Sequence, residues 1–537
     1  MNKRLTNIIL VLLAAVCALP MMGQGSSDPV LRDKITNAVM KVYDEQIAND
    51  PNDYNTLFAR AHQNFYNGDY TAALADVNQA LLLTPLSDKE LRFDEYILRA
   101  RISDARRDYT GELADLQLAQ ALQPKSLACT DLIAKANLKA GNLDAAEKAF
   151  KTILRAESMN YDAMYGLAQV EQAKGNASAA IDHASKAVSL FRVEPQVYVN
   201  RADIYARQGN IDAAVRDLID GMSVGDGGNA AQRLFDLSDT NYDAVMRSLA
   251  ALADKSSDGG GIYRYLRANI AMDHSRYGQA LKDLNYIKRN NLYDSPMVDY
   301  NTAKSCLELC RYDEAIQLID KAIEKEPSRP EYYLVKAEAE YYADEKGNAD
   351  AALQALNACS LISPQYVPML LAKAELYAAQ GENNEALGYL NAALANESGN
   401  PEALYMRSLL FQRMNNFKLA TKDWNTMLLL GDDLYSLNGL AQNGLGRDND
   451  ALAWLHKITS TNLPGGENFY YAAAFMAARG DNYKAMEYLG KALDLGYGSL
   501  HNLKREVLSP VNINSLRDLP DFGLLIDKAQ RNFIEGE

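Results

Sequence analysis

The feature that most limits how this chain can fold is a repeat of fixed length. Gly141, Gly175 and Gly209 are spaced 34 residues apart, and an alanine follows each of them five residues later. A constant period of this size, with a glycine between two amphipathic segments, is typical of a helical solenoid. The sequence therefore predicts helical hairpins that stack in one direction, each covering the apolar face of the hairpin before it.

Residues 196–221 indicate how one hairpin forms. Apolar residues recur with helical spacing on both sides of Gly209 and Asn210. These two residue types enter the left-handed region at low cost, so they end the first helix and reverse the chain. Asp212 falls in the first turn of the second helix, where a negative charge favours the helix dipole. Small side chains at Ala202 and Ala214 are expected where the two helices touch.

The spacing of these glycines and alanines resembles the tetratricopeptide repeat (TPR) family, and related positions recur from Tyr54 to Leu500. The resemblance implies an all-α fold, an α-solenoid of about thirteen helix-turn-helix repeats. The pattern weakens among glycine clusters at 226–260, which either join two arrays as a hinge or continue one solenoid with longer loops. We expect a signal peptide at 1–23, an N-terminal capping helix at 28–53, a first TPR array at 54–225, a degenerate repeat at 226–260, a second TPR array at 261–500 and a C-terminal capping segment at 501–537.

The N-terminal segment has the order of a secretory signal peptide. Lys3 and Arg4 precede an apolar run at 8–19, and Gly23 and Gly25 follow it. The run has 12 residues, fewer than the ~20 that a membrane-spanning helix needs. We therefore expect cleavage near Gly23 or Gly25, and export to the periplasm or cell envelope of a bacterium.

An alternative interpretation makes Cys17 a lipidated residue, as in bacterial lipoproteins. Val16 stands where that family has glycine, alanine or serine, which counts against lipidation. No other run in the sequence is long and apolar enough to cross a membrane. Any outer-membrane association of the mature chain would therefore go through a partner.

The charge of the chain bears on its partners. The formal net charge is -15, and loss of the two positive charges of Lys3 and Arg4 would make it -17. Nucleic-acid binding needs a clustered basic face, so we expect no nucleic-acid partner. A solvated acidic surface that keeps a long array in solution accounts for the charge.

The residues that usually carry chemistry are scattered. The five histidines, His62, His183, His274, His456 and His501, lie in separate repeats, and none belongs to a pair with metal-ligand spacing. No phosphate-binding loop, nucleophile elbow or dinucleotide fingerprint occurs. We therefore expect no catalytic, cofactor or metal site. Cys306 and Cys310 would share one helical face, where packing is favoured over a disulfide or a thiol pair.

The resemblance also implies a binding surface. In TPR proteins positions 2, 5, 9, 12 and 13 of the first helices line a concave groove. Tyrosines beside amides and charges suit extended peptides or protein segments, although packing between helices is an equally open role for each tyrosine. The candidate residues are Phe58, His62, Phe65, Tyr66, Tyr165, Gln169, Gln172, Asp203, Arg207, Tyr265, Asn269, Tyr300, Lys304, Glu338, Tyr341, Tyr342, Glu375 and Tyr405.

Three hypotheses about function follow. The leading one is a non-catalytic scaffold that binds other proteins in its groove. The second is an envelope protein that binds a glycan or nutrient on a TPR scaffold, against which the scarcity of tryptophan counts; the third is an enzyme with an unrecognised site. A clamp for chaperone tails is not expected, because Asn269 fills one of its two key positions but Tyr265 stands where that clamp has lysine.

Overall fold

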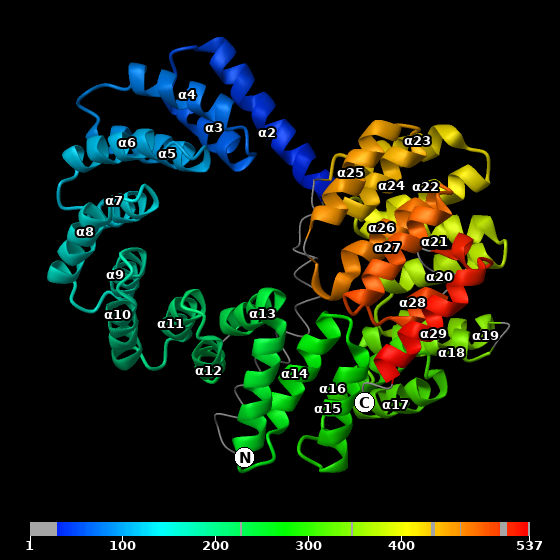
Figure 1. The fold of residues 1–537 in the computed structure, drawn as a ribbon. Helices are drawn as coiled ribbons and strands as arrows, with labels where there is room; N and C mark the ends of the chain where they lie inside the picture. Colours follow the sequence, from blue (N-terminus) through cyan, green and yellow to red (C-terminus); the bar gives the residue numbers. More distant parts are fainter. Residues whose placement is uncertain are drawn as a thin grey trace. The chain divides into compact units, whose positions relative to one another are not determined.

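The computed structural model describes residues 29–225, 228–344, 347–430, 435–461, 463–504 and 513–534. The predicted signal peptide and Cys17 lie outside these residues. The regular elements of the described ranges are all helices (Figure 1). The predicted all-α, repeat-based fold is therefore confirmed.

The chain divides into two compact units, which we describe separately. Unit 1 runs from Arg32 to Leu237 and unit 2 begins at Ser238. The division falls inside one long helix, α13 (Gly228–Lys255), which leaves helical geometry at Asn241 with φ -135° and ψ 35°. The repeat pattern of the sequence weakens in this same region.

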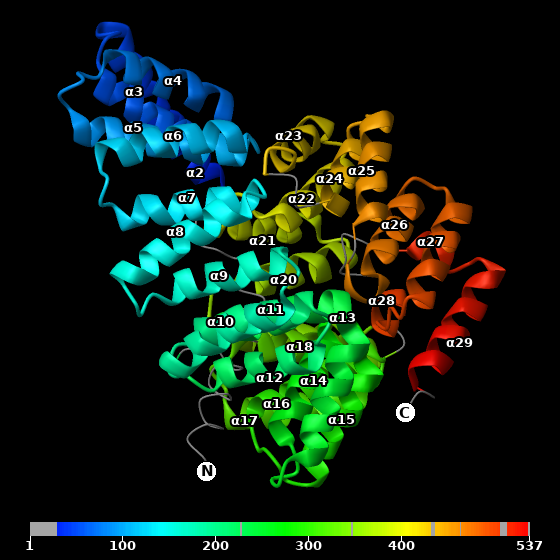
Figure 2. The same cartoon turned by 60° about the vertical axis from the view of Figure 1, so that its left-hand side comes forward.

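Unit 1 consists of one leading helix and five helical pairs that follow one another in order (Figure 2). The helices that begin the third, fourth and fifth pairs start at the residues that the period indicates. The helices are α2 (Pro29–Asn49), α3 (Tyr54–Tyr66), α4 (Tyr70–Leu83), α5 (Lys89–Ala105), α6 (Tyr109–Leu122), α7 (Leu127–Lys139), α8 (Leu143–Ala156), α9 (Tyr161–Ala173), α10 (Ala177–Leu190), α11 (Pro195–Arg207) and α12 (Ile211–Met222).

Unit 2 continues the same pairing and ends in shorter elements. Its pairs are α14 (Gly261–Asp273) and α15 (Tyr277–Arg289), α16 (Pro296–Glu308) and α17 (Tyr312–Lys325), α18 (Pro330–Ala343) and α19 (Ala349–Ile362), α20 (Val367–Ala379) and α21 (Asn383–Asn396), α22 (Pro401–Arg413) and α23 (Phe417–Met427), α24 (Tyr435–Gly444) and α25 (Asp448–Ser460), and α26 (Glu467–Ala478) and α27 (Asn482–Asp494). The remaining elements are η1 (Pro464–Gly466), α28 (Leu500–Lys504), η2 (Asn514–Leu516) and α29 (Pro520–Ile534).

Each hairpin turns through one residue in the left-handed region. Glycine fills this place in most repeats, as at Gly141 and Gly209, with φ of 77° and 74°. Four repeats use another residue there, namely Arg107, Ser275, Cys310 and Asn415, with φ between 55° and 60°. A side chain in this conformation costs free energy that glycine avoids.

The position of Cys310 corrects one expectation from the sequence. Helix α16 ends at Glu308, so Cys310 lies in the turn and does not share a helical face with Cys306. Cys306 is fully buried and neither residue is in a disulfide. The predicted helix extended two residues too far here, because the turn residue is a cysteine where other repeats have glycine.

The two helices of a pair approach closely at buried alanines. Ala202 of α11 and Ala214 of α12 are 2% and 0% exposed, as the sequence predicted. In an earlier pair, Ala134 of α7 and Ala146 of α8 belong to one hydrophobic cluster with Phe150. Small side chains let the helix axes come together, and larger apolar residues then fill the space toward the next pair.

An arginine bonded to a buried aspartate ties many of these pairs together. Arg201 of α11 donates from Nε and Nη2 to both carboxylate oxygens of Asp217 of α12, at 2.7 and 2.6 Å. This bidentate bond raises the pKa of the Arg201 guanidinium above its usual value. The same arrangement, always sixteen residues apart and at 2.6–2.9 Å, recurs at Arg60–Asp76, Arg99–Asp115, Arg267–Asp283 and Arg407–Asp423.

Several of these arginines also reach the second helix of the preceding pair. The Nη1 atom of Arg201 donates to Ser185 of α10 at 3.2 Å, and that of Arg407 donates to Asn391 of α21 at 2.8 Å. Arg60 makes the equivalent contact with Asp44 of the leading helix α2 at 2.7 Å. One side chain therefore joins three helices, and at Arg60 it attaches the leading helix to the first pair.

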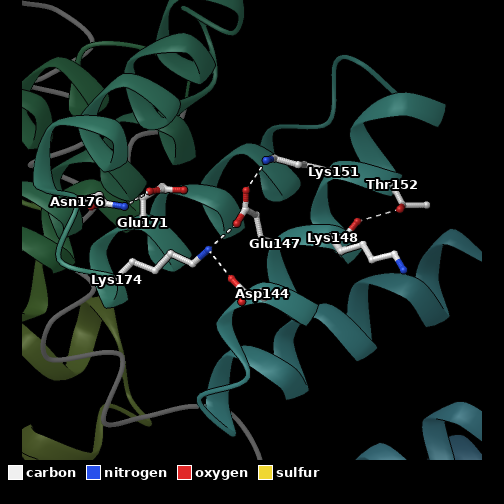
Figure 3. Close-up of polar contacts among 8 residues, drawn as sticks. All are labelled: Asp144, Glu147, Lys148, Lys151, Thr152, Glu171, Lys174 and Asn176. Atoms are coloured by element: carbon white, nitrogen blue, oxygen red, sulfur yellow. Dashed lines mark hydrogen bonds and ion pairs between the residues drawn. The ribbon is translucent and has the colours of Figure 1, made fainter.

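Surface ion pairs add a second link between neighbouring pairs (Figure 3). Lys174, directly after α9, points back to α8, where its Nζ lies 2.5 Å from Glu147 Oε2 and 2.9 Å from Asp144 Oδ1. Hydrogen bonds from Lys151 and Lys174 lower the pKa of Glu147 to about 2. Because these groups are closer to solvent than the aspartates of the arginine bonds, we assign them a minor role beside those bonds.

Substitutions at the turn position separate backbone strain from packing. Gly141 has open space where a Cβ would lie, so Gly141→Ala should lower the free energy of unfolding by about 1 kcal/mol through strain alone. Arg107→Gly should act in the opposite direction by a similar or smaller amount. The control, Gly388→Ala inside helix α21, also has open space and should be stabilising. Urea unfolding of the three variants tests this; a neutral Gly141→Ala would contradict it.

Candidate functional site

The side of each unit that the first helices of its pairs form is called its inner side. The inner side of unit 1 contains a pocket of about 500 Å³. It is built mainly from the first helices of four successive pairs, with part of α6 between them. Apolar, amide and charged side chains all face it. Its lining includes Ile97, Arg101 and Asp104 of α5, Glu112 and Leu116 of α6, Leu132, Lys135, Leu138 and Lys139 of α7, Asp162, Tyr165 and Gln169 of α9, and Gln196 and Asn200 of α11.

Hydrogen bonds fix the side chains at the end of this pocket that α9 and α11 form. The Tyr165 hydroxyl donates to Asp203 Oδ2 at 3.4 Å, and Arg233 Nε donates to Asp203 Oδ1 at 2.7 Å. Burial, together with the Asp203 charge, raises the pKa of Tyr165. Gln172 accepts a bond from Gln208 at 2.8 Å, while Arg207 is exposed. Tyr165 and Gln169 therefore line the pocket, and Asp203 positions Tyr165.

The first pair carries a strip of aromatic residues. The rings of Phe58 and His62 meet edge to face at 4.9 Å, and His62 stacks on Tyr66 at 6.2 Å. Phe58 and Phe65 pack partly against the core, whereas Tyr66 is 69% exposed. Burial and the nearby Arg101 charge lower the pKa of His62, which favours its neutral form. Of these four predicted groove residues, Tyr66 is the most available to a partner.

Several pocket residues were not among those predicted from the sequence. Arg101 and Asp104 lie at positions 9 and 12 of the second repeat, and Lys135, Leu138 and Lys139 lie at positions 9, 12 and 13 of the third. These are the same positions that gave the candidates in other repeats. Applying them to every repeat would have found this half of the pocket.

The inner side of unit 2 differs because the chain itself fills part of it. His501 of α28 is 2% exposed; its Nε2 lies 3.0 Å from Glu338 Oε1 and its Nδ1 lies 3.1 Å from the Tyr312 hydroxyl. The imidazole also meets the ring of Tyr342 edge to face at 4.8 Å. Glu338 and Tyr342, predicted as partner-binding residues, here bind the C-terminal segment of their own chain.

The backbone near α28 and at η1 also makes close contacts with the turn between α14 and α15. A Cβ on Gly498 would lie 2.0 Å from the carbonyl oxygen of Ser275, and one on Gly465 would lie 2.2 Å from that of His274. Ser499 Oγ donates to Glu308 at 2.5 Å. The last elements of unit 2 thus meet the turn between α14 and α15, and only glycine permits so close an approach.

Three predicted groove residues of unit 2 are buried and need correction. Tyr265 and Asn269 are 1% and 6% exposed, and Asn301 of the next pair donates to both, at 3.2 and 2.9 Å. Tyr405 is 6% exposed, and burial raises its pKa. These side chains pack between helices, the alternative role that was open for each tyrosine.

The other predicted residues of unit 2 lie nearer the surface. The rings of Tyr300 and Tyr332 are 5.0 Å apart, and Tyr341 meets Tyr342 edge to face at 4.9 Å. Lys304 is half-buried. Glu375 lines a small pocket of about 180 Å³ that it shares with Glu338 and Glu402.

One group of described residues has the composition of a metal site. Ligand atoms of Asp239, Asp273 and His274 lie within 4.8 Å of one another. Burial and the charge of Asp239 raise the pKa of Asp273 to about 6, and burial lowers that of His274 to about 4. His274 Nε2 is already hydrogen-bonded to Ser238 at 3.1 Å, and Asp239 is exposed. We assign no metal or cofactor to this group.

Family models for tetratricopeptide repeats match residues 132–195, 195–221 and 265–330. These residues are tetratricopeptide repeats. The TPR pattern thus occurs in both units, including α9 and α11, which form one side of the large pocket. TPR arrays in general offer concave surfaces to other proteins.

Individual proteins with TPR similarity cover part or most of the chain. The tetratricopeptide repeat and J domain-containing co-chaperone DNJ1 of Fusarium oxysporum f. sp. lycopersici is 37% identical over 90 residues. The match spans 16% of this chain and only 17% of the length of that relative. The solved structure of yeast Tom70 covers 90% of this chain and 96% of its own, at 14% identity and a TM-score of 0.34. That of a thermophilic TPR protein from Thermus thermophilus covers 34% and 98%, at 22% identity and a TM-score of 0.31.

No helix in the described ranges is both long enough and apolar enough to cross a bilayer.

The backbone of the C-terminal segment lies so close to Ser275 that Gly498 should not tolerate a larger residue. Gly498→Ala should push the segment 496–504 away from Ser275, because the new methyl group would overlap a backbone carbonyl. We expect faster amide exchange in α28, and a loss of about 1–3 kcal/mol in stability. Hydrogen-deuterium exchange with mass spectrometry measures the first effect.

The matched control for this experiment is Gly490→Ala in α27, where a Cβ has open space. It should leave exchange in α28 unchanged. Equal exchange in wild type and Gly498→Ala would show that the close contact does not hold the segment.

Proposed function

We propose that this protein is a non-catalytic scaffold that binds an extended segment of another protein on the inner side of unit 1. The observation that supports this most strongly is the pocket of about 500 Å³, which first helices of four successive repeats build together. A segment lying across them would contact each repeat in turn. That arrangement suits an extended chain better than a compact ligand.

The chemistry of the lining supports the same proposal. Leu132, Leu138 and Ile97 offer apolar contact, while Gln169 and Asn200 offer amides that can bond a peptide backbone. Unit 2 is the weaker candidate, because His501 already occupies the Glu338 and Tyr342 side chains. The binding role is therefore assigned to unit 1.

We further propose that the protein acts in the periplasm or cell envelope of a bacterium. The support for this is the N-terminal sequence alone: Lys3 and Arg4, the apolar run at 8–19 and the small residues Gly23 and Gly25. Lipidation at Cys17 is the competing outcome, and a cleaved, soluble chain is the one we favour.

The binding role can be tested by capture with a groove variant. Gln169→Lys places a long charged side chain in the pocket, whereas Thr152→Lys adds the same charge on the second helix α8, where Thr152 is exposed. Proteins cross-linked to the whole mature chain in its native envelope fraction should be lost, by about ten-fold or more, only with Gln169→Lys.

Cross-link sites mapped by mass spectrometry complete this test. They should fall on α5, α7, α9 and α11 and be absent from α8. Capture that is equal for both variants, or that links only the second helices, would contradict a groove in unit 1. Capture of no protein above background would contradict the scaffold proposal itself.

Export predicts a processed N terminus. The protein purified from its native cells should begin near residue 24 or 26, which intact-mass measurement and N-terminal sequencing would detect. Lys3→Asp with Arg4→Asp should slow processing, because the basic start is lost. An unprocessed Met1 in the native protein would refute export, whereas a lipid-modified Cys17 at its N terminus would refute the soluble, cleaved form.

A further inference from the structure

The pocket of unit 1 contains a buried carboxyl group with an unsatisfied atom. Glu112, in the first turn of α6, is 6% exposed and lines the pocket. Its Oε2 atom is buried and has no hydrogen-bond partner among the described residues. A buried polar atom without a partner costs free energy, so a protein that keeps one needs an explanation.

The surroundings of Glu112 leave the carboxyl group short of positive charge. Burial, and secondarily the charge of Asp104, raise the pKa of Glu112. Lys139 is the nearby cation that opposes this shift, but its Nζ lies 2.6 Å from both carboxylate oxygens of Asp104. The cation that could satisfy Glu112 is therefore held by another acid.

The other cations of the pocket are also engaged. Lys135 pairs with Asp131 of its own helix at 2.6 Å. The guanidinium of Arg101 lies over the ring of Phe65, 4.9 Å from its centroid. Glu112 thus remains a buried acid of this pocket with an oxygen that the described residues do not satisfy.

We propose that Glu112 is a specificity residue that binds a lysine or arginine side chain of the partner segment. This inference rests on the proposed function and names the chemistry of its partner. The ammonium or guanidinium group donates to the Glu112 carboxylate. The aliphatic stem of the cation lies on Ala100, Leu116 and Leu132, which also line the pocket.

The choice of a cation over a neutral donor follows from the charge balance. A hydrogen bond to an ionised carboxylate is stronger than one between neutral groups, and it strengthens further away from water. A neutral amide would satisfy one oxygen and leave the charge of the carboxylate uncompensated.

Glu95 offers a matched control in the same unit. It is fully buried, burial raises its pKa, and its Oε2 also lacks a partner. Its Oε1 accepts a bond from Thr84 at 2.5 Å, and Glu95 does not line the pocket. Glu95→Gln therefore changes a similar carboxyl group without touching the binding surface.

The test uses the whole mature chain and two fluorescein-labelled nonapeptides of threonine, alanine and glycine. They differ only at the centre, which is lysine in one and glutamine in the other. Fluorescence anisotropy should show that wild type and Glu95→Gln bind the lysine peptide at least about ten-fold more tightly than the glutamine peptide. In Glu112→Gln and Glu112→Leu this ratio should fall to about one.

A stability measurement separates this role from a structural one. Glu112→Leu removes an unsatisfied buried atom, so it should raise the midpoint of urea unfolding while it removes the preference for lysine. A residue kept only for stability would give a lower midpoint.

Three outcomes would overturn the inference. They are equal affinity of wild type for the two peptides, a lysine preference that survives in Glu112→Gln, and no saturable binding of the lysine peptide up to about 1 mM. Groove-dependent capture of a protein partner would still stand in each case, so the scaffold proposal and the inference about Glu112 fail separately.

Discussion

The structure depends on one constraint: a helical hairpin has an apolar face that it cannot cover by itself. Within each unit the next pair covers it, and buried alanines such as Ala202 and Ala214 allow the close approach that this requires. The part-buried arginine bonds then link neighbours, since Arg201 holds Asp217 of its own pair and Ser185 of the preceding one. The ends of an array need a different solution, and the two units solve this problem differently. In unit 1 a leading helix is attached through Arg60 and Asp44, whereas in unit 2 the chain returns to its own first pair.

This difference decides which inner surface is open to a partner. In unit 2 the segment that contains His501 contacts Tyr312, Glu338 and Tyr342, the kind of aromatic and acidic side chains that were expected to hold another protein. In unit 1 the corresponding side faces a pocket whose polar groups are mostly paired with one another. Glu112 is a buried exception, and a buried polar atom without a partner among the described residues is where a functional role is expected. The site is thus inferred from what the fold leaves unsatisfied and needs no recognisable motif.

Much of the fold was readable from the sequence because its contacts are local. The helices at Leu127, Tyr161 and Pro195 begin where the period places them, and Gly209 adopts the expected left-handed turn. The arginine bonds were missed although their spacing of sixteen residues is regular, because a charged pair on two helices is ordinarily interpreted as solvated surface. The contacts of His501 could not have been predicted, since Tyr312 is 189 residues away in the chain and no periodic signal links them. Tyr265 and Tyr405 were placed in the groove by position alone, which does not distinguish a groove residue from one between helices.

The return of the chain in unit 2 has a consequence for how the protein is made. Contacts between neighbouring repeats can form as soon as each pair leaves the ribosome, because they join residues a few tens of positions apart. The bonds of Ser499 to Glu308 and of His501 to Tyr312 span 191 and 189 residues, and they wait for the last part of synthesis. Until then the inner side of unit 2 is uncovered while unit 1 is already complete. During biosynthesis unit 2 therefore exposes an inner surface that is partly covered in the finished chain, whereas the inner surface of unit 1 stays the same.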